Sequence, residues 1–178
     1  TLNRQRIAVL RFDFTGLGDS EGDFAETNFT SNVADLVAVA RFLAEEFEAP
    51  KLLIGHSLGG SAALQAAQHI PSVVGVATIA APADTRHLAR LLASTKATAE
   101  AAGEARVTIG GATFRLKKQF FDDLERANMQ RTVASLGRAL LVLHSPADRT
   151  VDIENAMQIF AAARHPKSFI SLDTADHL

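Results

Sequence analysis

The sequence predicts an α/β fold with a mostly parallel sheet and helices on both faces. Two runs of strand length, 50–54 and 73–80, are largely apolar, and 73–80 has no polar face, which is typical of strands that are buried on both faces of a parallel sheet. Helical patterns alternate with such runs, as crossovers between parallel strands require. The chain has 178 residues, of which 47% are hydrophobic, so it is large enough for one domain with a buried core.

Each element of this fold has its own signal in the chain. The segment 32–48 places apolar residues at helical spacing, Ser31 or Asn32 can cap it, and Pro50 ends it. An alanine-rich helix is expected from 61 to 70, and a further helix after Asp152, which can cap it. The strands are expected at 6–14, 50–54, 73–80, 138–144 and 168–172.

Residues 83–137 interrupt this alternation and are too many for a connection between two parallel strands. They contain helical patterns at 85–101 and 117–136, and between these a hairpin pattern around 110–112. We therefore expect an α/β core formed by 1–82 and 138–178, with 83–137 inserted as a small, mainly helical cap.

Composition excludes several classes of function. The net charge of −2 and the lack of a long basic run argue against nucleic-acid or membrane-surface partners. The absence of cysteine excludes disulfides and thiol nucleophiles, and no His/Asp/Glu cluster has metal-ligand spacing. No run of 18 apolar residues and no signal-peptide pattern is present. These features predict a cytoplasmic protein that needs no cofactor and no metal.

The candidate nucleophile is Ser57, in the run G-H-S-L-G-G from Gly55 to Gly60. A strand precedes this run and a helix follows it, so the serine stands at a sharp strand-to-helix corner. Gly55 and Gly59 lack a Cβ, which allows strand and helix to pass close together. The helix N-terminus directs N–H groups toward developing negative charge. A glycine-rich turn with a helix-capping serine is the alternative interpretation.

A serine hydroxyl needs a base beside it, and a histidine base needs a carboxylate to fix its tautomer. Asp148 follows the strand at 138–144, and His177 follows the last strand. Both therefore lie at the same carboxyl edge of a parallel sheet as Ser57, which is where the sites of such sheets form. His144 is the alternative base and Asp152 the alternative carboxylate.

Four segments carry a resemblance to a known family: R-F-D-F-T-G-L-G-D-S-E-G, G-H-S-L-G-G, L-L-V-L-H-S-P-A-D-R-T-V and S-L-D-T-A-D-H-L. With them, the sequence resembles the α/β-hydrolase fold family of serine esterase type over essentially its whole length. It is most similar to bacterial hydrolases that are often fused to an OsmC-like domain, which depends on cysteines that this chain lacks. The resemblance implies Ser57 as nucleophile, Asp148 as orienting acid, His177 as base and the Leu58 N–H as oxyanion donor.

The family also has strands before 6–14 and a helix after the histidine. One of those strands lies in the sheet between the strands expected at 6–14 and 50–54, and the loop after it supplies a second oxyanion donor. None of these is in the sequence, so either the strand at 6–14 pairs with 50–54 or a second copy fills the gap in a homodimer. The expected function is cleavage of small carboxylic esters through an acyl-enzyme on Ser57, at a low rate. A catalytically weak or inactive hydrolase-fold binding module is the alternative.

Overall fold

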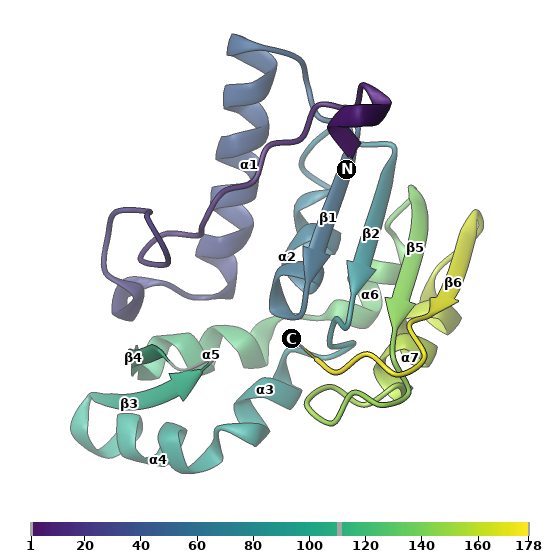
Figure 1. Cartoon of the computed structure of the whole chain (residues 1–178). Helices are drawn as coiled ribbons and strands as arrows, with labels where there is room; N and C mark the ends of the chain where they lie inside the picture. The colour runs from purple at the N-terminus through teal and green to yellow at the C-terminus, as the bar shows by residue number, and fades with distance from the viewer. Residues whose placement is uncertain (1, 110–111, 178) are drawn as a thin grey trace.

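Four parallel strands form the centre of the molecule (Figure 1). The computed structural model describes residues 2–109 and 112–177. In the sheet, neighbours follow the order β1-β2-β5-β6, and every pair is parallel. The predicted α/β fold with a parallel sheet is therefore confirmed. The strands are β1 (Leu52–His56), β2 (Gly75–Ile79), β5 (Ala139–His144) and β6 (Lys167–Ser171).

The helices follow the predicted alternation with shifted ends. Asn28 caps α1 rather than Ser31 or Asn32, because its side chain accepts from the N–H of Ser31 while the Ser31 hydroxyl accepts from the N–H of Asn28. The pattern at 117–136 is divided into two helices, the second of which Asn128 caps. The helices are α1 (Phe29–Glu46), α2 (Leu58–Ala66), α3 (Arg86–Leu91), α4 (Ala93–Ala102), α5 (Lys118–Arg126), α6 (Met129–Ala134) and α7 (Glu154–Ala162), with 3₁₀ turns η1 (Leu2–Gln5) and η2 (Phe24–Glu26).

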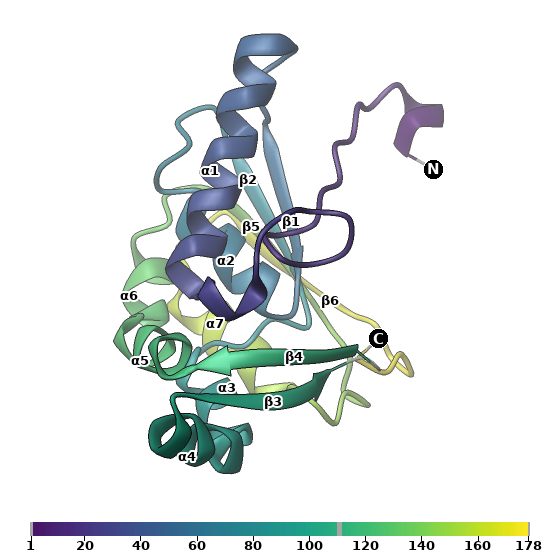
Figure 2. The same cartoon turned by 90° about the vertical axis from the view of Figure 1, so that its left-hand side faces the viewer.

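The helices that flank the sheet lie on one of its faces, which corrects the expectation of helices on both (Figure 2). Leu53, Val76 and Leu140 are neighbours in register and are buried under these helices. On the opposite face, Leu52 and Ile54 are 60% and 58% exposed. The cause is topological: the strands are added in one direction across the sheet, and right-handed crossovers made in one direction all fall on the same side.

The expected strand at 6–14 is absent, although all of its residues are described. Ile7 and Val9 are 47% and 55% exposed, and the segment does not pair with β1. The turn that follows is fixed instead on α1, because the Asp35 carboxylate accepts from the N–H of Thr15 at 2.9 Å and from its hydroxyl at 3.1 Å. An apolar run shows a preference for burial, but a strand also needs a neighbour for its backbone hydrogen bonds.

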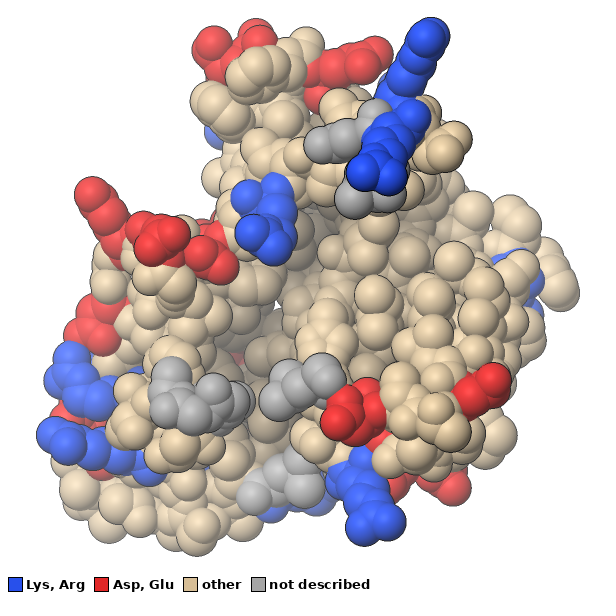
Figure 3. Space-filling model, in the orientation of Figure 1, with Lys and Arg blue, Asp and Glu red and all other residues tan. Residues whose placement is uncertain are grey.

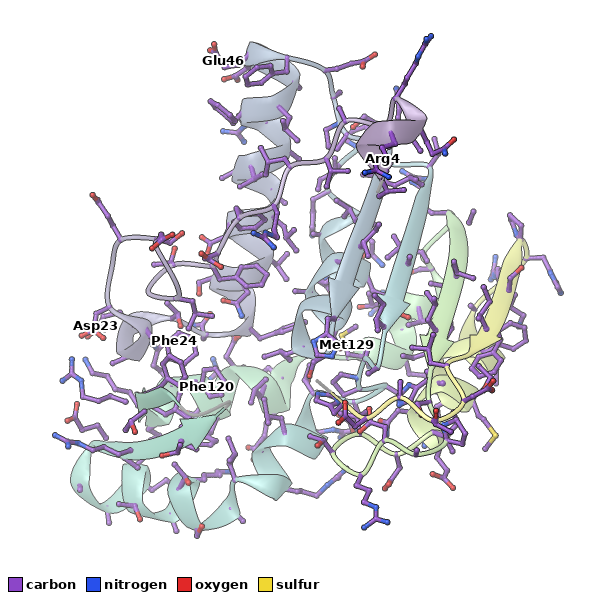
Figure 4. All side chains as sticks on the ribbon, viewed as in Figure 1. Arg4, Asp23, Phe24, Glu46, Phe120 and Met129 are labelled. Carbon is purple, nitrogen blue, oxygen red and sulfur yellow. The ribbon has the colours of Figure 1, made fainter. Side chains whose placement is uncertain are left out.

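Residues 83–137 contain the predicted hairpin, with β3 (Glu104–Ile109) antiparallel to β4 (Ala112–Lys117). Residues 110–111 of its expected turn lie outside the described residues. Phe24 of η2 packs on this part of the chain, with its ring centroid 4.9 Å from that of Phe114 and 6.2 Å from that of Phe120 (Figure 4). By contrast α6 packs against α2 and α7, beside the sheet.

Ion pairs add to the contact between the hairpin and η2. Arg115 pairs with Asp23, and Lys117 pairs with Glu26. Because these side chains are largely exposed, each pair contributes at most about 1 kcal/mol. The Phe24–Phe114 contact and these two ion pairs together join the hairpin to η2.

Candidate active site

Ser57 occupies the corner between β1 and α2 in a backbone conformation that residues other than glycine rarely adopt. Its φ is 51° and its ψ is −130°. Such a conformation costs on the order of 1–3 kcal/mol and persists only where the surroundings impose it. Here they do, because the Ser57 N–H donates to the carbonyl of Ile79 and its own carbonyl accepts from Gly60, both at 2.9 Å.

Two glycines around Ser57 make the close approach of strand and helix possible. A Cβ added to Gly55 would lie 2.3 Å from the carbonyl oxygen of Gly59, and one added to Gly60 would lie 2.7 Å from the Cβ of Ala81. A Cβ on Gly59 would meet only a ring carbon of Phe14, at 3.7 Å. The expectation for Gly55 holds, whereas the second close approach is at Gly60 and not at Gly59.

The structure brings Ser57, His177 and Asp148 into one chain of hydrogen bonds. His177 Nδ1 lies 2.7 Å from Asp148 Oδ2, and His177 Nε2 lies 3.0 Å from Ser57 Oγ. A carboxylate only accepts, so Nδ1 carries the proton and Nε2 is free to accept from the Ser57 hydroxyl. The arrangement can therefore draw the hydroxyl proton toward His177 while Asp148 stabilises the imidazolium that results.

Asp148 is held by its own loop. Its side chain is fully buried, and Oδ1 accepts from the N–H groups of Thr150 at 2.8 Å and Val151 at 2.9 Å. Burial alone would raise the pKa of Asp148, but the hydrogen bonds from His177, Val151 and Thr150 outweigh it and hold that pKa below its usual range. The carboxylate is therefore charged wherever the fold is intact near neutral pH.

The two alternative residues have other contacts. His144 is fully buried, and its Nε2 donates to the carbonyl of Val151 at 2.7 Å, which directs the ring into the Asp148 loop. The backbone carbonyl of Asp152 accepts from Asn155 at 2.9 Å, and α7 begins without a side-chain cap, so the expected capping by Asp152 is wrong. The ring that contacts Ser57 is that of His177.

Leu58, the expected oxyanion donor, is the first residue of α2. The first N–H groups of a helix have no partner within it, so that of Leu58 is available to a ligand beside Ser57. Sequence reasoning did not find a contact of His56, whose Nε2 lies 2.7 Å from the carbonyl oxygen of His177. The only signal for it was its place next to Ser57 in the motif.

The surface around the strands carries few charged side chains, and acidic and basic residues lie mainly at its margin (Figure 3). Two cavities of about 620 and 640 Å³ lie elsewhere, and none of the three residues in the hydrogen-bonded chain lines them. Within the described ranges, no group of three His, Asp or Glu side chains could hold a metal ion. In the same residues, no helix is both long and apolar enough to cross a membrane.

Comparisons with known proteins identify similar structures and sequences. The chain is similar to the structure titled as the esterase domain of a Rhodothermus marinus protein, with 47% identity and a TM-score of 0.67 over 88% of this chain and 64% of that one. It is also similar to the mouse alpha/beta hydrolase domain-containing protein 10, with 25% identity and a TM-score of 0.74 over 94% of this chain and 68% of that one.

Two curated relatives extend the comparison. The uncharacterized protein YfhR of Salmonella typhi is 26% identical over 99% of this chain and 57% of its own length. The mitochondrial palmitoyl-protein thioesterase ABHD10 of Mus musculus is 28% identical over 85% of this chain and 52% of its own length. The chain thus spans little more than half of these relatives. The model of the Alpha/beta hydrolase family matches residues 1–178, and the chain belongs to that family.

Proposed function

We propose that this chain is a serine hydrolase that cleaves small carboxylic esters through an acyl-enzyme on Ser57. The observation that carries the proposal is the continuous path from Asp148 Oδ2 through the His177 ring to Ser57 Oγ, with distances of 2.7 and 3.0 Å. Membership of a family with esterase and thioesterase relatives supports it.

In the proposed reaction, Ser57 Oγ attacks the ester carbonyl carbon while His177 Nε2 takes the hydroxyl proton. The carbonyl oxygen becomes an oxyanion, which accepts from the N–H of Leu58. The bond to the alcohol then breaks, and His177 returns the proton to that leaving group. A water molecule, deprotonated by the same nitrogen, finally cleaves the acyl-enzyme and restores Ser57.

The proposal is tested by measuring p-nitrophenyl butyrate hydrolysis and fluorophosphonate labelling of the native chain and of Ser57→Ala. We expect the native chain to hydrolyse the ester and to be labelled, and the variant to do neither, because only the hydroxyl of Ser57 is removed. Hydrolysis that persists in Ser57→Ala would overturn the assignment. Absence of both signals in the folded native chain would favour the alternative of a binding module.

The same hydrolysis assay can compare substrates that differ in their acyl group or in the atom that leaves. Because a relative is named a palmitoyl-protein thioesterase, we propose thioesters as a second substrate class to compare with oxygen esters. Matched butyryl oxygen ester and thioester substrates isolate the leaving atom, and Ser57→Ala is the control for both.

We also propose that two copies associate through the open edge of the sheet at β1. The β1 edge has no neighbour among the described strands, so its outer backbone groups have no sheet partner. The apolar side chains of Leu52 and Ile54 beside this edge are 60% and 58% exposed. Pairing of two such edges would satisfy these backbone groups and give Leu52 and Ile54 cross-strand apolar neighbours on the same face.

A further inference from the structure

The segment that carries His177 must cross the whole sheet to reach Ser57. It leaves β6 at one edge and runs past the ends of β5 and β2 to β1 at the other edge (Figure 1). Three strand spacings of about 4.8 Å give a path of about 14 Å. Six residues, 172–177, can span at most about 20 Å when fully extended, so the segment has little slack.

Packing does not hold this segment in place, because residues 173–176 are all exposed. Its first half is fixed near β5 and β6, where the N–H of Leu172 donates to the carbonyl of His144 and the hydroxyl of Ser145 donates to the carbonyl of Asp173, both at 2.9 Å. These contacts lie at the far side of the sheet from Ser57. Asp148 holds the His177 ring through Nδ1 at 2.7 Å, but neither that bond nor these contacts involve the backbone carbonyl of His177.

His56 supplies a contact at the β1 end. It is the last residue of β1, directly before Ser57, and its Nε2 lies 2.7 Å from the carbonyl oxygen of His177. A carbonyl only accepts, so Nε2 carries a proton and donates it. The two rings have their centroids 4.9 Å apart. His56 therefore contacts the backbone of His177, and Ser57 contacts its ring.

We infer that His56 is a positioning residue, which fixes the backbone of His177 so that its Nε2 points at Ser57 Oγ. The inference rests on the proposed function, in which His177 is the base. His56 acts through His177 and takes no part in the bond changes. An error of about 1 Å in the position of a reacting group can cost about a hundredfold in rate, so one hydrogen bond at this place has a large effect on turnover.

The test compares His56→Phe, which keeps a ring but has no donor, with His56→Gln, whose amide N–H has about the same reach. We expect kcat for p-nitrophenyl butyrate to fall about ten- to a hundredfold in His56→Phe, with KM changed less than about twofold. His56→Gln should recover kcat to within about threefold of the native chain. Equal losses in the two variants, or a loss that appears in KM, would overturn the inference.

A second comparison separates positioning from a general loss of structure. In a His177→Ala background, His56→Phe should cause no further fall in the residual rate, because the ring that it positions is already gone. A further fall of the same size as in the native background would contradict the inference.

Hydrogen exchange of the amides of residues 172–177 gives a readout that does not depend on turnover. We expect faster exchange in His56→Phe than in the native chain and in His56→Gln. Unchanged exchange would refute the positioning role of the hydrogen bond from His56 to the His177 carbonyl. If the native chain hydrolyses no ester but exchange is faster in His56→Phe, the proposed function fails and the positioning role of His56 holds.

Discussion

Replacing Gly55 by alanine should damage the candidate site without touching any of its polar groups. The added Cβ would lie 2.3 Å from the carbonyl oxygen of Gly59, 2.5 Å from its carbonyl carbon and 2.6 Å from the Cα of Gly60. All three are backbone atoms at the start of α2, so no side-chain rotation relieves the clash. The helix or the strand must move.

The size of the effect follows from these distances. An ordinary contact begins at 3.4 Å, so the shortest contact demands a shift of about 1.1 Å between β1 and α2. Overpacking of this kind costs typically about 1–3 kcal/mol of stability. Because Ser57 lies between the two elements, the same shift moves Oγ relative to His177 Nε2, and a displacement of about 1 Å can lower kcat about a hundredfold.

Gly59→Ala is the matched control. Its Cβ would meet only a ring carbon of Phe14 at 3.7 Å, and alanine is favoured over glycine within a helix by about 1 kcal/mol. We expect Gly59→Ala to keep its rate of p-nitrophenyl butyrate hydrolysis and to unfold in urea at the native concentration or above it. Gly55→Ala should lose both rate and stability. Equal behaviour of the two variants would refute the reasoning from backbone approach.

Two further predictions concern Asp148 and the β1 edge. The pKa of Asp148 is lowered in the folded chain, so its stabilising effect is present above the unfolded pKa of about 3.9 and is lost as pH falls through the folded value. Urea unfolding should therefore show the native free energy of unfolding falling more steeply than that of Asp148→Asn between about pH 5 and pH 2, and parallel curves would contradict this. At the β1 edge, Ile54→Lys should shift sedimentation equilibrium toward the 19.0 kDa monomer, whereas a native chain that is already monomeric at high concentration would exclude the proposed dimer.

Sequence patterns predicted the four strands of the sheet because each is a largely apolar run of strand length, although one face of the sheet is exposed. The runs at 73–80 and 138–144 contain β2 and β5, and the alternation with helices indicated that the strands are parallel. The position of the helices was harder to predict, since it depends on the direction in which strands are added and on the handedness of crossovers. The segment 6–14 shows the same limit, because no local pattern reveals whether a strand has a partner.

The proximity of Ser57, Asp148 and His177 was predictable because each follows a strand of one parallel sheet, and such ends share an edge. The contact of His56 with the His177 carbonyl was not, since it depends on the path of residues 172–177 across that edge. The second close approach was expected at Gly59 but lies at Gly60, and the reason is similar. Which glycine faces Ala81 is set by the rotation of α2 about its axis, and the motif alone does not state that rotation.

The order of strands has a consequence for how the chain folds. Neighbours in the sheet appear in the same order along the sequence, so the sheet can grow from β1 toward β6 as the chain is made. Ser57 lies after the first strand, and its partner His177, 120 positions away, lies after the last. The hydrogen-bonded chain therefore closes only when β6 has docked. Recovery of the proposed esterase activity during refolding would therefore report the final step of assembly, whereas the circular dichroism signals of helices and strands can return earlier.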